Sequence, residues 1–307
     1  MAVQAGVRAA IVTRQQRRRN LLPYMLALPI LIYEGLFILL PIVQEILSSF
    51  TNDVIGAGAV KWVGSANYTR MLNDPNFWKS MRTTLTYMVL VVTLSLIIGL
   101  ISALLLNEAG RGRSIVRTAI TLPWAFPEVP TVLVFLWLLN PSFGVINIAA
   151  HLLPGVEQNP RWFLDVNWAM PSVVMISVWK AFPFYSLVLL AAMQTIPAEL
   201  YEAAKVDGAN SVQSFRFITL PSIAPTLTLL GVLACIFAFR QLVLIWLTTG
   251  GGPGGATETL VIRVYNTAFR FFDFSYGATL GTAGFIVVFV ITVIFSIMQS
   301  RRAGDKS

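Results

Sequence analysis

The sequence predicts an all-α membrane protein that crosses the bilayer six times. Of its 307 residues, 56% are hydrophobic and only 12% are charged. A soluble domain needs more charge to cover its surface, whereas a surface that faces lipid does not. Six stretches reach the roughly 20 apolar residues that cross the hydrocarbon core of a bilayer. Because backbone polar groups in lipid must be hydrogen-bonded within their own segment, each stretch is predicted to be a helix.

These six spans form one transmembrane domain, residues 22–299, with no second domain. The predicted spans are 22–43, 83–106, 118–139, 169–192, 223–247 and 279–299. Proline interrupts several of them, and the third is the least regular because it contains Pro123, Pro127 and Pro130. Proline frees a carbonyl group and kinks a helix, so this span is expected to line a pathway or a helix interface rather than lipid.

The distribution of basic residues predicts the orientation. One set of alternating segments holds 13 Lys and Arg in 70 positions, namely 1–21, 107–117, 193–222 and 300–307. The other set holds 7 in 99 positions, namely 44–82, 140–168 and 248–278. Since cytoplasmic loops carry the excess of positive charge, the first set is predicted to be cytoplasmic, with both termini inside.

The two ends of the chain are therefore predicted to be cytoplasmic tails, residues 1–21 and 300–307. The first tail is basic, with Arg14, Arg17, Arg18 and Arg19 just before the first span. Such a run can bind nucleic acid, but beside a membrane span it is typical of attraction to anionic lipid. We expect membrane lipid, and no nucleic acid, as its partner.

The cytoplasmic loop 193–222 is predicted to form two short helices beneath the membrane. Pro197 is suited to the first turn of a helix, and Glu199 and Glu202 favour the positive end of its dipole. Gly208 can adopt the left-handed conformation that ends a helix. Ser211 is predicted to cap a second helix leading to Pro221, where the fifth span begins.

Leu200, Ala203 and Ala204 form an apolar strip on the first of these helices. A solvated loop between spans is the simpler alternative, but it does not explain small apolar residues on a surface helix. The spacing of the loop is E-A-A, three residues, G, nine residues, then I-x-L-P, from Glu202 to Pro221.

At these residues the sequence resembles the permease subunits of binding-protein-dependent ABC importers, and within them the carbohydrate-uptake members related to the maltose and glycerol-3-phosphate permeases. Further blocks that resemble this subfamily are 201–209, Trp137 with 143–147, 248–253, 257–260 and 276–277. The resemblance covers roughly residues 20 to 300 and implies the type I importer permease fold.

In that family the cytoplasmic loop docks into a cleft on an ATPase subunit. By resemblance, the ATPase-coupling residues here are Glu202, Ala203, Ala204, Asp207, Gly208, Ile218, Leu220 and Pro221. The chain contains no G-x-x-x-x-G-K-[ST] sequence, so ATP and Mg are expected on the partner ATPase. The chain itself is expected to be a non-catalytic subunit without cofactor or metal.

The resemblance also implies partners and a location. The partners are a second, homologous permease, an ATPase dimer and an extracytoplasmic sugar-binding protein. Residues predicted to face the binding protein are Gly250, Gly251, Gly252 and Pro253, although a plain glycine-rich turn explains them equally well. The expected location is the plasma membrane of a bacterium or archaeon, as a multi-pass protein.

Four ionisable residues fall inside predicted spans, where a charge is costly unless it is paired or hydrated. Aromatic faces with a few fixed donors suit a sugar, whose C–H faces stack while its hydroxyls form hydrogen bonds. The predicted substrate-path residues are Glu34, Glu128, Trp179, Lys180, Phe182, Tyr185, Arg240 and Gln241. The structural alternative is that Glu34 or Glu128 pairs with Lys180, and that Arg240 extends to the outer interface.

The predicted function is the permease subunit of an ATP-driven importer for a mono-, di- or oligosaccharide. Import of glycerol-3-phosphate is the nearest alternative. A self-sufficient secondary transporter would need an ion-coupling site and no docking helix. An intramembrane zinc protease is excluded by motif, because the single histidine, His151, lies in no H-E-x-x-H sequence.

Overall fold

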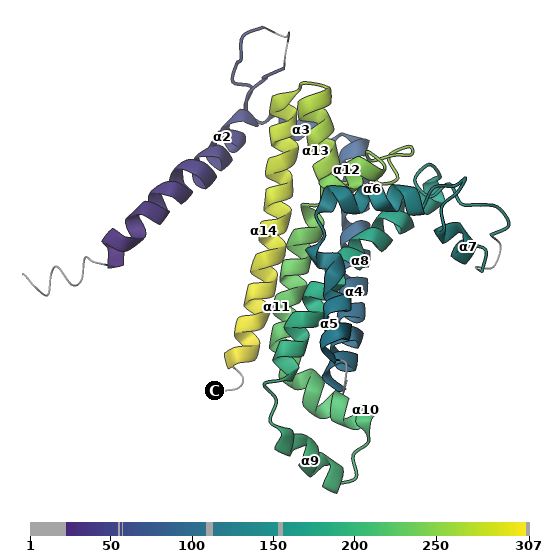
Figure 1. The fold of residues 1–307 in the computed structure, drawn as a ribbon. Helices are drawn as coiled ribbons and strands as arrows, with labels where there is room; N and C mark the ends of the chain where they lie inside the picture. The colour runs from purple at the N-terminus through teal and green to yellow at the C-terminus, as the bar shows by residue number, and fades with distance from the viewer. Residues whose placement is uncertain (1–22, 55, 57, 109–112, 153–155, 305–307) are drawn as a thin grey trace, which may run out of the picture.

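The computed structural model describes residues 23–54, 56, 58–108, 113–152 and 156–304, and the described part is a bundle of helices (Figure 1). The predicted tail 1–21 lies outside the described residues. Five described helices are long and apolar enough to cross a membrane, namely Pro23–Ser48, Pro75–Asn107, Val166–Met193, Ser211–Phe239 and Phe274–Phe295. A sixth crossing requires two helices taken together, Ser114–Ala125 and Glu128–Leu138.

The helical elements follow one another through the described residues. Within the first helix, Pro23–Ser48, lie a π-helical turn η1 (Gly35–Leu39) and α2 (Leu40–Ser48). Next come α3 (Ala66–Leu72), α4 (Pro75–Glu108), α5 (Arg113–Ala125), α6 (Glu128–Leu138), α7 (Ile146–Ala150) and α8 (Val166–Met193). Then follow α9 (Ala198–Val206), α10 (Ser211–Ser214), η2 (Phe215–Thr219), α11 (Leu220–Phe239), α12 (Val243–Thr248), α13 (Leu260–Tyr265), η3 (Asn266–Arg270) and α14 (Phe274–Gly304).

The short helices between the spans lie at two opposite ends of the bundle. In Figure 1, α9 and α10 lie at one end together with the last turns of α14, while α3 and α13 lie at the opposite end. This arrangement agrees with the orientation predicted from the basic residues, which places the loop 193–222 inside and the segments 44–82 and 248–278 outside.

The third predicted span is not one helix. Its two halves, α5 and α6, are bent by 98°. The break lies at Pro127, whose backbone is extended (φ −61°, ψ 148°). Proline disfavours the helical conformation of the residue before it, here Phe126, and it cannot donate a backbone hydrogen bond. The proline cluster therefore turns the chain, and α6 lies across the direction of α5 (Figure 1).

The fifth predicted span, 223–247, also differs from the structure. The helix begins at Ser211, well before the predicted start, and ends at Phe239. Arg240 follows as the C-terminal capping residue, and a separate short helix, α12, begins at Val243. Two consecutive polar residues, Arg240 and Gln241, thus lie at the end of a helix rather than inside it.

Two prolines are accommodated by π turns. Pro41 and Pro221 each occupy the second position of a helix that directly follows a π turn. In both cases the residue before the proline bonds five residues back, Leu40 N–H to the Gly35 carbonyl and Leu220 N–H to the Phe215 carbonyl. The wider turn carries the helix past a residue that lacks an N–H group. Pro221 therefore does not start a new helix, which corrects the predicted boundary.

The centre of the bundle is the pair α4 and α8, which pack along each other more extensively than any other two described helices. Gly99 lies in a close contact between them, where a Cβ atom would meet Tyr185 Cβ at 3.0 Å and the Phe182 carbonyl oxygen at 3.2 Å. Tyr87 and Ser177 join the same helices by a buried hydrogen bond of 2.8 Å. Small residues permit such close contact between helices in lipid.

The first helix lies apart from the bundle along most of its length, and its apolar window has no buried residue (Figure 1). It meets α14 only near its outer end. There the Glu45 carboxyl group fills the space that Gly281 leaves by having no side chain. A long apolar helix without covering residues is expected to contact lipid or another subunit.

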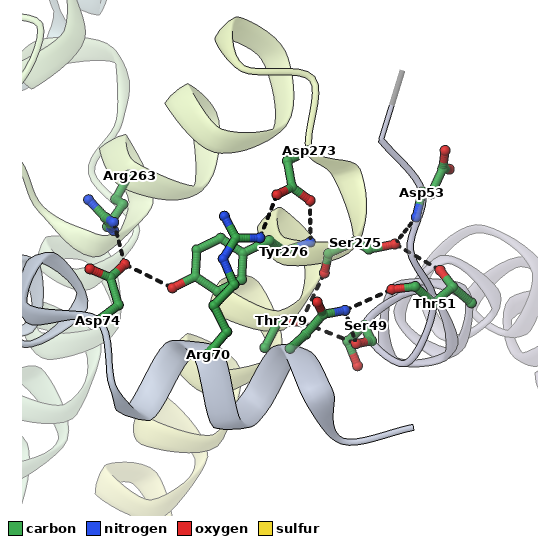
Figure 2. Close-up of polar contacts among 11 residues, drawn as sticks. Ser49, Thr51, Asp53, Arg70, Asp74, Arg263, Asp273, Ser275, Tyr276 and Thr279 are labelled. Atoms are coloured by element: carbon green, nitrogen blue, oxygen red, sulfur yellow. Dashed lines mark hydrogen bonds and ion pairs between the residues drawn. The ribbon is translucent and has the colours of Figure 1, made fainter. Parts of the chain in front are cut away.

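A polar network joins the outer elements (Figure 2). Arg70 of α3 forms an ion pair with Asp273 (2.7 Å), and Arg263 of α13 forms one with Asp74 (2.5 Å), just before α4. Burial alone would raise the pKa of Asp74, but hydrogen bonds from Tyr276, the Asn76 backbone and Arg263 hold that pKa below its usual value of 3.8.

The same network reaches the segment that follows the first helix. The Ser275 hydroxyl bonds to the Thr51 hydroxyl (2.8 Å) and accepts from the Asp53 N–H (2.6 Å). The Thr279 hydroxyl donates to the Ser49 carbonyl oxygen (3.2 Å). Hydrogen bonds therefore tie the end of the first helix to the start of α14.

The contact at Gly99 gives a test of the packing. We expect Gly99→Ala to lower stability by about 1–3 kcal/mol, because the added methyl group overpacks the α4–α8 contact. Gly231, which has no atom within 4 Å of an added Cβ, is the matched control, and Gly231→Ala should leave stability unchanged or slightly higher. Thermal unfolding in detergent measures both, and equal melting temperatures would contradict the proposed close contact.

Candidate functional site

The cytoplasmic loop is built around one short, sharply terminated helix. After α9 the Gly208 N–H donates to the Lys205 carbonyl (3.2 Å), and the Ala209 N–H donates to the Ala204 carbonyl (2.8 Å). This pair of bonds is the Schellman termination, and it requires a left-handed residue, here Gly208 with φ +82°. The predicted role of Gly208 in ending the helix is confirmed.

Both helix starts differ in detail from the sequence prediction. Pro197 is the capping residue before α9, which begins at Ala198, rather than a residue of its first turn. At α10 the cap is Asn210, not Ser211: its side chain accepts from the Gln213 N–H (2.9 Å), and Gln213 accepts from the Asn210 N–H (2.8 Å). Asn caps well, and Gln three residues later completes the box.

The predicted coupling residues of α9 face solvent. Glu202, Ala203, Asp207 and Gly208 are exposed, and Ala204 is half-buried. Apolar neighbours are exposed as well, with Val206 at 88%. Exposed apolar side chains beside small residues form a surface that a partner can approach closely.

The remaining coupling residues lie at the base of the same unit. Ile218 and Leu220 are half-buried, and Pro221 is exposed, where η2 passes into α11. The Tyr201 hydroxyl of α9 bonds to the Thr219 hydroxyl (2.8 Å), which holds α9 against this base. Because α9 also follows α8 directly, a force on α9 acts on both α8 and α11.

A cavity of about 380 Å³ lies between the middle of α8 and the end of α11 that is far from α9. Five predicted substrate-path residues line this cavity, which we call the path cavity: Glu128, Lys180, Tyr185, Arg240 and Gln241. Aromatic side chains that the sequence prediction did not include also line it, namely Trp124, Phe184 and Phe237. Polar groups set among aromatic rings are the composition of a small-molecule site.

Lys180 does not form the ion pair that the structural alternative predicted. Its Nζ donates to the Phe126 carbonyl oxygen (2.6 Å). In an unbroken helix this carbonyl would accept from residue 130, but Pro130 has no N–H to donate. Lys180 therefore replaces the hydrogen bond that proline removed, and no ion pair between described residues includes Lys180 or Glu128.

Glu128 and Arg240 have different neighbours. Glu128 opens α6, where a carboxylate favours the helix dipole, and it accepts a hydrogen bond from Gln241 Nε2 (2.7 Å). This bond joins α6 to the segment after α11. Arg240 is exposed, and its guanidinium carbon lies 5.5 Å from the Phe237 ring centroid. The cavity lining thus carries two cations and one carboxylate.

Three predicted substrate-path residues lie elsewhere. Trp179 and Phe182 line an apolar groove between α4 and α8, and Glu34 is exposed on the first helix. The spacing of residues along α8 already distinguishes the residues that share the face of Lys180 from those that do not. Ser177 and Phe184 lie three and four residues from Lys180 and share its face, whereas Trp179 and Phe182 belong to another face.

The glycine-rich segment forms a compact turn whose carbonyl groups accept hydrogen bonds from neighbouring side chains. Gly250 and Gly251 have φ of +60° and +93°, and Gly251 is buried against Ile262. The Thr257 hydroxyl donates to the Gly252 carbonyl (2.8 Å), and Lys79 Nζ donates to the Gly254 carbonyl (2.6 Å). The structure explains the glycines by conformation, and contact of Gly250–Pro253 with a binding protein stays a prediction.

Comparison with known proteins agrees with this architecture. The family described as binding-protein-dependent transport system inner membrane component matches residues 95–302. The trehalose/maltose transport system permease protein MalF of Thermococcus litoralis is 34% identical over 93% of this chain and 96% of its own. The sulfoquinovosyl glycerol transport system permease protein SmoG of Agrobacterium fabrum is 33% identical over 90% of this chain and 89% of its own.

Solved structures show the same fold. A chain of a bacterial ABC transporter involved in the import of the acidic polysaccharide alginate superposes with a TM-score of 0.80 and 25% identity, over 94% of this chain and 98% of that chain. The alginate transporter in complex with its pentasaccharide-bound periplasmic protein gives a TM-score of 0.81 at 24% identity, over 94% and 96%. This chain belongs to the family of inner membrane components of binding-protein-dependent transport systems.

Proposed function

We propose that this chain is the permease subunit of an ATP-driven importer for a sugar. The observation that carries the proposal is the direct connection between α9 and the path cavity through α8 and α11. Lys180 and Tyr185 lie on α8, and Arg240 ends α11. Movement of α9 would therefore move two walls of the cavity together.

A carbohydrate cargo is supported by the chemistry of the path cavity and by the relatives. The names of two similar permeases state transport of trehalose or maltose and of sulfoquinovosyl glycerol. The aromatic rings of Trp124 and Phe184, whose centroids are 5.9 Å apart, offer stacking surface beside the Lys180 and Gln241 donors. Sugars use this combination of stacking and hydrogen bonding.

Glycerol-3-phosphate is the second candidate cargo, and a specific observation favours it. The cavity lining contains two cationic side chains, Lys180 and Arg240, and only one carboxylate, Glu128. An anionic group on the cargo would balance this charge. Competition between radiolabelled sugars and glycerol-3-phosphate for uptake by the reconstituted transporter distinguishes the two.

The proposal includes three kinds of partner. A cytoplasmic ATPase dimer, which binds ATP and Mg, would contact the exposed face of α9. A second permease would cover part of the first helix, whose apolar window is unburied. An extracytoplasmic sugar-binding protein would deliver cargo at the end that carries α3 and α13. The assembly would lie in the plasma membrane of a bacterium or archaeon.

We expect Gly208→Pro and Glu202→Lys to insert normally yet to lower ATP-driven uptake at least about tenfold, which corresponds to about 1.4 kcal/mol of lost coupling. Proline cannot adopt φ +82° and has no N–H for the Lys205 carbonyl. Uptake and ATP hydrolysis are measured in proteoliposomes. Gly208→Asn is the matched control, because asparagine tolerates this conformation. Undiminished uptake in both test variants would contradict the proposal that the ATPase docks at this loop.

We expect Lys180→Met to weaken the apparent affinity for transported sugar by about tenfold, or about 1.4 kcal/mol, since two of its three ammonium donors remain available to cargo. Trp179→Phe, on the other face of α8, should leave affinity unchanged. The measurement is the sugar concentration at half-maximal uptake, with the melting temperature followed in parallel. A lower melting temperature with unchanged affinity would show that Lys180 only supports the Phe126 carbonyl.

A further inference from the structure

A second polar cavity, of about 390 Å³, lies at the outer end of the bundle, and we call it the outer pocket. Its lining comes from two segments, around α3 and from the loop before α13 to the start of α14 (Figure 2). Both segments are predicted to be extracytoplasmic. The path cavity and the loop 193–222 share no residue with it.

The outer pocket carries an excess of negative charge. Its lining contains three carboxylates and two guanidinium groups. Asp273 is paired with Arg70 at 2.7 Å and Asp74 with Arg263 at 2.5 Å. The third carboxylate, Glu258, lies 3.9 Å from Arg263 and accepts one hydrogen bond at 3.5 Å from Asn266. Of the three carboxylates, Glu258 is therefore the one farthest from a guanidinium nitrogen.

An unsatisfied acceptor lies beside Glu258. Asn266 is only 8% exposed, lines the pocket, and has no hydrogen-bond partner for its Oδ1 atom among the described residues. The Nε atom of Arg263 is buried and without a partner as well. A buried polar atom without a partner has lost its bonds to water with no replacement, so these atoms favour a ligand that supplies bonds to both.

The chemistry of that ligand follows from the two atoms and the charge. Asn266 Oδ1 and the Glu258 carboxylate both need a donor, and a cationic ammonium or guanidinium group provides several. Arg263 Nε needs an acceptor, which a backbone carbonyl of the bound segment would supply. A protein loop that carries a lysine or arginine therefore meets both requirements, with the side chain as donor and the backbone as acceptor.

The rim of the outer pocket has the composition of a protein interface. Phe271, at the pocket, is 73% exposed, and its neighbours Phe269 and Phe272 are 59% and 48% exposed. Phe272 adopts φ +55°, which is uncommon for a residue with a bulky side chain. Exposed aromatic residues around a polar centre are typical of surfaces that bind another protein.

We propose that the outer pocket receives a lysine or arginine side chain of the extracytoplasmic binding protein, with Phe271 and its neighbours packing against the surface around that side chain. This inference rests on the proposed function. It assigns the docking contact to Glu258 in the loop before α13, Asn266 at the start of η3, and Phe271 directly after η3. The ion pairs of Asp74 and Asp273 link the same pocket to α3, α4 and α14. A force exerted by the docked protein would therefore act directly on the transmembrane helices.

The test uses the complete transporter purified through this chain, with the binding protein that belongs to it and its transported sugar. ATP hydrolysis in proteoliposomes is measured against binding-protein concentration. We expect Glu258→Gln to raise the half-saturating concentration about tenfold with an unchanged maximal rate. The dependence of that concentration on salt should become weaker. Glu157→Gln, at an exposed carboxylate of another outer segment, is the matched control.

Phe271→Ser provides a second variant that does not depend on the buried network, because this side chain is largely exposed, and it should raise the same concentration. Unchanged half-saturation in both variants overturns the proposal. The proposal is also overturned if the variants change only the concentration of free sugar needed for stimulation, because the pocket would then bind sugar. Loss of the second permease from the purified complex overturns it as well, because the pocket would then contact that subunit. Absence of stimulation in the wild-type transporter would instead refute the proposed function.

Discussion

The arrangement of this protein depends on the backbone hydrogen bonds that proline removes from helices in lipid. Each freed carbonyl group there needs another partner, because no water is available. At Pro41 and Pro221 the residue before the proline bonds five residues back in a π turn, and the helix continues. At Pro130 the side chain of Lys180 takes over the Phe126 carbonyl, and the chain turns through 98°. The same chemical defect thus leads either to a continuous span or to a broken one.

The broken span determines where the path cavity lies. Because α6 begins after the break, Glu128 meets Gln241 at the end of α11, while Lys180 reaches across from α8. Three helices contribute polar groups to one small volume. Two of them, α8 and α11, continue to α9 at the cytoplasmic end. Packed helices move as rigid bodies, so the geometry allows motion at α9 to change the cavity without a separate transmission element.

Among the described residues, apolar side chains are left uncovered along the first helix, at α9 and at the outer rim. The first helix has an unburied apolar length, α9 exposes Val206 beside its small residues, and the outer rim exposes Phe271. Isolated apolar side chains on a surface are ordinary, but continuous or clustered ones mark contacts with lipid or other chains. They lie along the membrane and at its two faces, where other subunits of a binding-protein-dependent transport system can contact them.

The sequence by itself determined the class of fold, the approximate position of five of the spans, and the helix that Gly208 terminates. These features rest on local chemistry, namely apolar length, basic flanks and the left-handed conformation available to glycine. Local spacing also contained the information that Trp179 and Phe182 leave the face of Lys180, although the predicted site did not use it.

Only the tertiary structure decided the partners of the charged residues. Lys180 bonds to a backbone carbonyl 54 residues away, and Arg263 pairs with Asp74 across 189 residues. Nothing in the composition of either segment specifies such a contact, because it depends on how the helices bend and pack. The proline cluster predicted a break, but the angle of that break, and therefore which side chains line the path cavity, was decided by packing among α5, α6, α8 and α12.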